Sequence, residues 1–218
     1  MAAKPVSVRP ATVAVSLGWV LVIELLTQWG LPYVALPSLV ILGIGRALQT
    51  AGMLWAVIRW EGGLDAIGWS SRNWPKGLLQ GALWSLGFAL AAGLGMLLIH
   101  LSGRDPLTLL RSPLGARPAD RMLFFLVGGL IAPVAEEICF RGVLYTFFRR
   151  WGIAAALAAS TAIFVVLHST HGLPVTQIVG GVVFALAYET SRNLMVPMTI
   201  HVLGNLAIFF LSLPVFAR

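Results

Sequence analysis

The sequence predicts an all-α fold, a polytopic bundle of about seven transmembrane helices. Hydrophobic residues make up 58 % of the 218-residue chain and charged residues only 11 %, whereas roughly 25 % of an ordinary soluble domain is charged. Three long stretches, 77–103, 151–188 and 193–217, contain no Asp, Glu, Lys or Arg. A soluble protein of this size could not cover so much apolar surface, so we expect a lipid bilayer to surround it.

The helices are placed by the rule that one span needs about 20 mostly apolar residues. Turn-forming or polar stretches separate them, for example Gly30-Leu31-Pro32 after the first and the proline-containing loop 102–120 after the third. No small-x-small cleavage site follows the first apolar run, which we interpret as an uncleaved span. The predicted helices cover 11–29, 34–58, 77–100, 121–149, 152–170, 174–190 and 194–213.

The net charge of +7 is carried mostly by Lys and Arg in the short connections. No helix has a basic face, so we predict no nucleic-acid partner and assign these charges to membrane topology. Their distribution slightly favours a cytoplasmic N-terminus. We expect a multi-pass integral membrane protein, located in a bacterial inner membrane.

The fourth predicted helix carries three ionisable residues, Glu136, Glu137 and Arg141, within two turns. Each costs at least ~2.5–3.5 kcal/mol at bilayer depth, so each needs an explanation. Adjacent residues on a helix point about 100° apart, and Glu137 and Arg141 have the i, i+4 spacing of an ion pair. We therefore predict that Arg141 holds Glu137, which leaves Glu136 as the free carboxylate.

Three further polar residues lie in apolar helices: His168 in the fifth, and His201 and Asn205 one turn apart in the seventh. Counting ~1.5 Å per residue places Glu136 and His168 at similar depth, whereas His201 lies nearer its helix end. A carboxylate and an imidazole in one dry cavity can activate water. A second imidazole and an amide can stabilise an oxyanion, so the set suits hydrolysis of an amide or ester.

In sequence order these residues resemble the CPBP family of intramembrane proteases, which includes the CAAX proteases and the bacterial Abi proteins. The resemblance covers about residues 120–210 and rests on three motifs, Glu-Glu-x-x-x-Arg, Phe-x-x-x-His and His-x-x-x-Asn. The residues that match them are Glu136, Glu137, Arg141, Phe164, His168, His201 and Asn205.

The resemblance implies an intramembrane endopeptidase with N-terminal helices and loops in 1–120 and a catalytic core in 121–213. In this family pattern Glu136 and His168 activate water, while His201 and Asn205 stabilise the oxyanion. Glu137, Arg141 and Phe164 would support them. The implied partners are the lipid bilayer and a membrane-associated protein or peptide substrate.

A zinc site formed by Glu136, His168 and His201 is the alternative to a metal-free mechanism. We favour the mechanism without a cofactor because Asn205 is a poor zinc ligand and a good hydrogen-bond donor.

Two other functions fit the same composition. A non-catalytic membrane partner or immunity protein could keep the cavity for binding. A transporter or proton relay is suggested by the further buried charges Glu24, Arg46 and Glu189, although Glu24 and Arg46 could simply pair. The chain lacks the repeated, interrupted helices of many secondary transporters.

Overall fold

The computed structural model describes residues 7–30, 33, 35–109, 112, 114–168 and 174–213. These residues form seven helices and no strand, which confirms the predicted fold class. Six of the helices are α1 (Pro10–Gly30), α2 (Ser38–Glu61), α3 (Trp74–Leu101), α7 (Ile153–His168), α8 (Val175–Ser191) and α9 (Met195–Leu211).

The remaining helix is continuous from Pro118 to Trp151 but changes its winding along the way. Two π-helical segments interrupt it, and π segments are frequent at functional sites. Pro133 follows the first of them, and proline has no backbone N–H to sustain the regular α pattern. In order, its parts are α4 (Pro118–Leu126), a π segment (Val127–Ile131), α5 (Ala132–Glu137), a second π segment (Ile138–Tyr145), α6 (Thr146–Phe148) and a 3₁₀ turn (Arg149–Trp151).

Four of these helices are long and apolar enough to cross a membrane: Pro10–Trp29, Ser38–Glu61, Ser71–Leu101 and Pro118–Trp151. Two more, α7 and α9, are apolar but shorter than 18 residues. The chain is therefore an integral membrane protein, and in the part of it that the structure describes four helices meet the length and composition of a full span. The helix bounds also differ from the predicted ones by a few residues, since α2 begins at Ser38 after Pro37 and α3 begins at Trp74 before Pro75.

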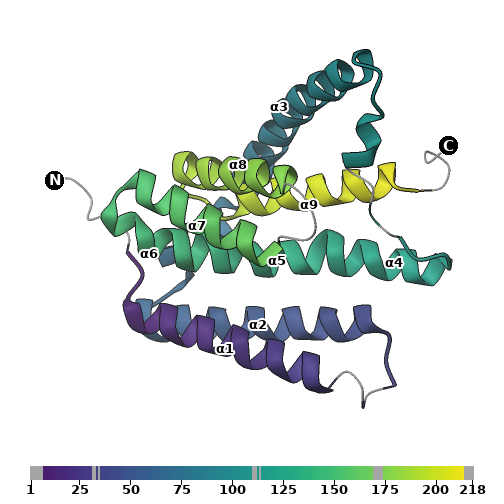
Figure 1. The fold of residues 1–218 in the computed structure, drawn as a ribbon. Coiled ribbons are helices and arrows are strands. Elements are labelled where there is room, and N and C mark those ends of the chain that lie inside the picture. The colour runs from purple at the N-terminus through teal and green to yellow at the C-terminus, as the bar shows by residue number, and fades with distance from the viewer. Residues whose placement is uncertain are drawn as a thin grey trace.

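The helices pack around the Pro118–Trp151 helix, as Figure 1 shows. The α1–α2 hairpin lies on one side of it, with α2 in contact with α5, and helices α7, α8 and α9 lie on the other. The first half of α3 packs on α9, where Gly77 and Gly81 allow close contact with Met195 and Thr199. The second half of α3 projects away from the bundle (Figure 1).

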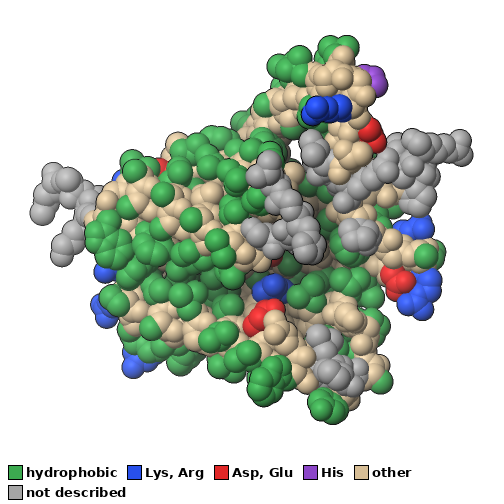
Figure 2. Space-filling model, viewed as in Figure 1, with side chains coloured by type: hydrophobic (Ala, Val, Ile, Leu, Met, Phe, Trp, Pro, Cys, Tyr) green, Lys and Arg blue, Asp and Glu red, His purple; other side chains and the backbone are tan. Residues whose placement is uncertain are grey.

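The outer surface is dominated by hydrophobic side chains. On the face in Figure 2, green side chains cover most of the described surface and most charged side chains gather toward its edges. Leu90, Leu94 and Leu98 on α3 are each more than half exposed. This distribution suits a protein whose solvent is lipid.

Candidate active site

Three helices bring their ionisable side chains together at Glu136. Its Oε2 atom lies 3.4 Å from His168 Nε2 on α7 and 3.7 Å from His201 Nε2 on α9. The side chains of Glu136 and His201 are 15 % and 7 % exposed, and that of His168 is 31 % exposed. The depth of His201, which appeared too shallow from the sequence, is thus no obstacle to contact with Glu136.

The ring of His168 is oriented by the turn that precedes it. Nδ1 lies 2.8 Å from the carbonyl oxygen of Phe164, and the two rings lie 4.3 Å apart between centroids. A carbonyl only accepts hydrogen bonds, so Nδ1 is the protonated nitrogen. In the neutral ring Nε2 is then an unprotonated base facing Glu136.

Glu137 and Arg141 form a buried pair that also holds His201. Arg141 Nη1 donates to Glu137 Oε1 at 3.0 Å, and both side chains are fully buried. The same Oε1 atom lies 2.8 Å from His201 Nδ1. The two adjacent glutamates therefore contact opposite nitrogens of one imidazole, Glu137 at Nδ1 and Glu136 at Nε2. The predicted contact between Glu137 and Arg141 is present in the structure.

Aromatic rings enclose this network. The Arg141 guanidinium lies 5.0 Å from the ring centroid of Phe164, 5.1 Å from that of Phe184 and 5.8 Å from that of Phe140. Phe184 also stacks on His201, with centroids 4.6 Å apart and planes at 23°. Such contacts stabilise a buried cation and fix an imidazole plane.

Sequence reasoning missed the contribution of α8. Besides Phe184, this helix supplies the carbonyl oxygen of Gly181, which accepts a hydrogen bond from Arg141 Nη2 at 3.2 Å. A Cβ at Gly181 would lie 2.8 Å from Thr161, so glycine allows α8 to approach α7 closely. The pair Gly180-Gly181 in an otherwise apolar helix was the signal available in the sequence.

Asn205 is anchored to the Pro118–Trp151 helix. Its Nδ2 donates to the carbonyl oxygen of Gly128 at 3.0 Å. In the π segment, the N–H of Ala132 bonds to the carbonyl of Val127, and by the same pattern residue 133 would bond to Gly128. Residue 133 is proline, so the Gly128 carbonyl has no such donor and Asn205 takes that place.

The zinc alternative is compatible with part of this geometry. Ligands 2.0–2.2 Å from a tetrahedral ion are roughly 3.4 Å from one another, close to the two nitrogen–oxygen distances at Glu136. Within the ranges that the structure describes, however, no group of three or more His, Cys, Asp or Glu is arranged to hold a metal ion. Zinc dependence stays a prediction for experiment.

Comparison with known families supports the motif resemblance. Residues 118–207 match the family described as type II CAAX prenyl endopeptidase Rce1-like. The segment is therefore similar to this family in sequence. The match includes all seven motif residues. No curated protein and no solved structure matches the chain.

Proposed function

We propose that the chain is an intramembrane endopeptidase that hydrolyses a peptide bond of a membrane-associated protein or peptide. The observation that carries the proposal is the approach of two imidazole nitrogens to a single carboxylate oxygen, Glu136 Oε2, from two other helices. Buried charges at membrane depth are costly and mark functional sites. The Rce1-like match over the same segment supports proteolysis as the activity.

In the proposed reaction a water molecule donates hydrogen bonds to Glu136 and His168. Glu136 takes a proton as the water oxygen attacks the substrate carbonyl carbon, which forms a tetrahedral intermediate with an oxyanion. The proton then passes to the leaving amine as the carbon–nitrogen bond breaks. The products are a carboxylic acid and an amine, so the step consumes one water and needs no redox partner.

His201 and Asn205 would stabilise the oxyanion. His201 can donate from Nε2 only as an imidazolium, since Nδ1 already faces Glu137. The Glu137 carboxylate stabilises that positive charge, as the aspartate that contacts the catalytic histidine does in a Ser-His-Asp triad. Asn205 uses one amide hydrogen on Gly128 and has a second for the oxyanion.

Cleavage of a prenylated CAAX peptide by the purified protein in detergent tests the proposal. Glu136→Gln and His168→Ala should each lower kcat by about 10²–10⁴-fold, the usual contribution of general acid–base catalysis. Cys139→Ser, on the same helix, is the matched control and should keep wild-type turnover. Unchanged turnover in Glu136→Gln would refute the glutamate mechanism.

A chelator in the same assay separates the two mechanisms. The metal-free mechanism predicts unchanged turnover after treatment, whereas a zinc enzyme should lose activity and recover it when Zn²⁺ is returned. Metal content of the purified protein provides a second measurement.

The charges that suggested a transporter have partners in the structure. Arg46 Nη1 lies 3.5 Å from Glu24, and Glu189 lies 3.0 Å from Arg149 and 2.6 Å from Arg192. They therefore give transport no specific support. A non-catalytic partner protein would be favoured if function in cells survived alanine at Glu136, His168, His201 and Asn205.

A further inference from the structure

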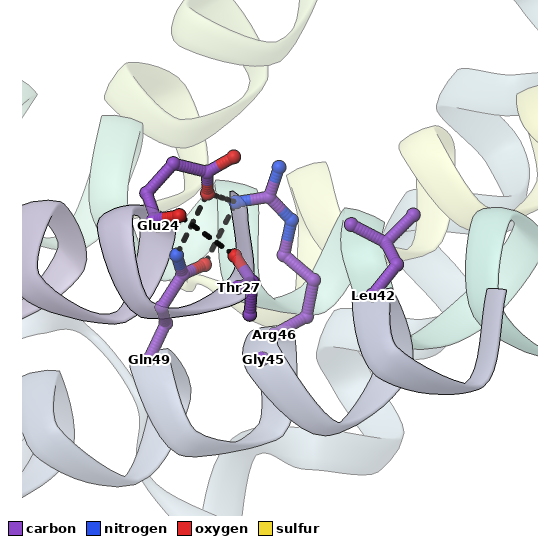
Figure 3. Close-up of a pocket in the computed structure, with 6 residues that line it drawn as sticks. All are labelled: Glu24, Thr27, Leu42, Gly45, Arg46 and Gln49. Atoms are coloured by element: carbon purple, nitrogen blue, oxygen red, sulfur yellow. Dashed lines mark hydrogen bonds and ion pairs between the residues drawn. The ribbon is translucent and has the colours of Figure 1, made fainter. Parts of the chain in front are cut away.

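A second polar cluster lies at membrane depth between α1 and α2, outside the residues of the proposed reaction. A small pocket of about 10 Å³ there is lined by Glu24, Thr27, Leu42, Gly45, Arg46 and Gln49 (Figure 3). Arg46 stands eight residues after the start of α2, or ~12 Å along the helix. An arginine at that depth is costly and is by default a functional residue.

The guanidinium of Arg46 is only partly used. One nitrogen, Nη1, makes both polar contacts, at 2.7 Å to Gln49 Oε1 and 3.5 Å to Glu24 Oε2. Nε is buried without a partner, and in Figure 3 the remaining nitrogen points away from Glu24 and Gln49. Arginine has five N–H donors and binds carboxylates best through two parallel hydrogen bonds. The long, single-nitrogen contact with Glu24 leaves other donors of the guanidinium unused.

The packing of α2 against the Pro118–Trp151 helix decides where Arg46 lies relative to the proposed active site. Gly43 of α2 lies against Val127, and α2 runs in the same direction as the Pro118–Trp151 helix (Figure 1). Arg46 stands three residues beyond Gly43 and Glu136 nine beyond Val127, an offset of six residues or ~9 Å along the axis.

We propose that Arg46 is a specificity-determining residue that binds a carboxylate of the peptide substrate next to Glu136. A guanidinium with an unused edge is suited to a carboxylate or a phosphate. The side chain is a quarter exposed, so a ligand can reach it. Its depth of ~12 Å from the helix start favours a peptide carboxylate over a phosphate of a lipid headgroup, which stays at the interface. This inference rests on the proposed endopeptidase function.

The test compares two prenylated CAAX peptides that differ only in a free C-terminal carboxylate or a C-terminal amide. The wild type should cleave the acid with a kcat/KM roughly 10- to 100-fold higher, the usual effect of a charged hydrogen bond. Arg46→Gln should reduce this ratio to about one, and Arg46→Lys should keep part of it. Arg59→Gln removes a charge from the same helix and should leave the ratio unchanged.

Glu24→Gln separates substrate binding from a purely structural ion pair. If Arg46 binds substrate, Glu24→Gln keeps the preference for the acid. A structural pair predicts equal effects of Glu24→Gln and Arg46→Gln, which would overturn the proposal. The double variant Glu24→Gln/Arg46→Gln avoids an unpaired buried charge and should also lack the preference for the acid. If the double variant kept this preference, the role of Arg46 would likewise be refuted.

Binding of the same peptides can be measured with the Glu136→Gln variant, because this measurement does not depend on cleavage. Tighter binding of the acid than of the amide, lost on adding Arg46→Gln, supports the inference even if the proposed hydrolysis fails. A third peptide in this comparison has a C-terminal amide and an added glutamate side chain. If only that side chain restores binding, the carboxylate recognised belongs to a side chain rather than to the chain end. Equal binding of all three peptides contradicts the inference.

Discussion

At the scale of single residues, one imidazole shows how the site is organised. His201 is held at Nδ1 by Glu137 and on one face by Phe184, so its Nε2 is directed toward Glu136. Glu137 is in turn fixed by Arg141. The side chains of Arg141, Glu137 and His201 are all buried, so removing one of them leaves its neighbour with an unsatisfied charge or donor.

Replacement of Arg141 tests the buried pair. Arg141→Ala should lower the free energy of unfolding by about 3–5 kcal/mol, because the buried Glu137 would lose its guanidinium partner and keep only its contact with His201. Denaturant titration in detergent micelles measures this change. Arg104→Ala, an exposed arginine in the loop after α3, is the control and should change stability by less than ~0.5 kcal/mol. Equal stability of the two variants would show that the pair is dispensable.

Phe184 should affect turnover through the orientation of His201. Phe184→Leu keeps an apolar side chain but removes the stacked ring. We expect kcat to fall roughly tenfold while KM for the peptide stays within twofold, because an oriented oxyanion donor acts in the transition state. Phe184→Tyr should restore most of kcat, since it keeps the ring. A loss confined to KM, or no rescue by tyrosine, would contradict a positioning role.

At the scale of secondary-structure elements, glycines decide where helices approach. Gly81 on α3 packs on α9, where an added Cβ would lie 2.5 Å from the Cβ of Thr199 and 2.9 Å from the carbonyl oxygen of Val196. Gly87, less than two turns further along α3, has no atom within 4 Å of such a Cβ. The same helix therefore contains a half that packs on α9 and, at Gly87, a position with open space beside it.

These two glycines form a matched pair for mutagenesis. Gly81→Ala should destabilise the protein by about 1–3 kcal/mol through overpacking of α3 on α9. Gly87→Ala should be neutral or stabilise by up to ~1 kcal/mol, since alanine is the better helix former and meets nothing. Thermal unfolding of both variants checks this. A larger loss at Gly87 would indicate that the projecting half of α3 packs against something in the membrane.

At the scale of the whole molecule, the direction of the helices fixes which ends share a side. The start of α1 and the end of α9 lie at opposite ends of the bundle (Figure 1). If all seven helices cross the bilayer, residues 7 and 213 face opposite aqueous compartments. The number of crossings needs a measurement because α7, α8 and α9 are shorter, and among the described residues four helices meet the length rule.

Cysteine labelling measures this arrangement. In a Cys139→Ser background, Ser7→Cys and Leu213→Cys should react with a membrane-impermeant thiol reagent from opposite sides of oriented vesicles. Labelling of both positions from the same side would show an even number of crossings. The parent Cys139→Ser protein, with no thiol, provides the blank.

The sequence by itself determined the lipid-embedded helical class, the approximate helix positions and the pairing of Glu137 with Arg141. Apolar run length and i, i+4 spacing are local properties, and local geometry fixes their consequences. The sequence could not show that Glu137 and Glu136 contact the two nitrogens of His201, or that Asn205 satisfies the carbonyl left free by Pro133. Those contacts join residues more than 60 positions apart, and only the packing of helices sets their distances. The same holds for Phe184, which carries no motif, and for Arg46, whose place beside Glu136 depends on how α2 lies against the Pro118–Trp151 helix.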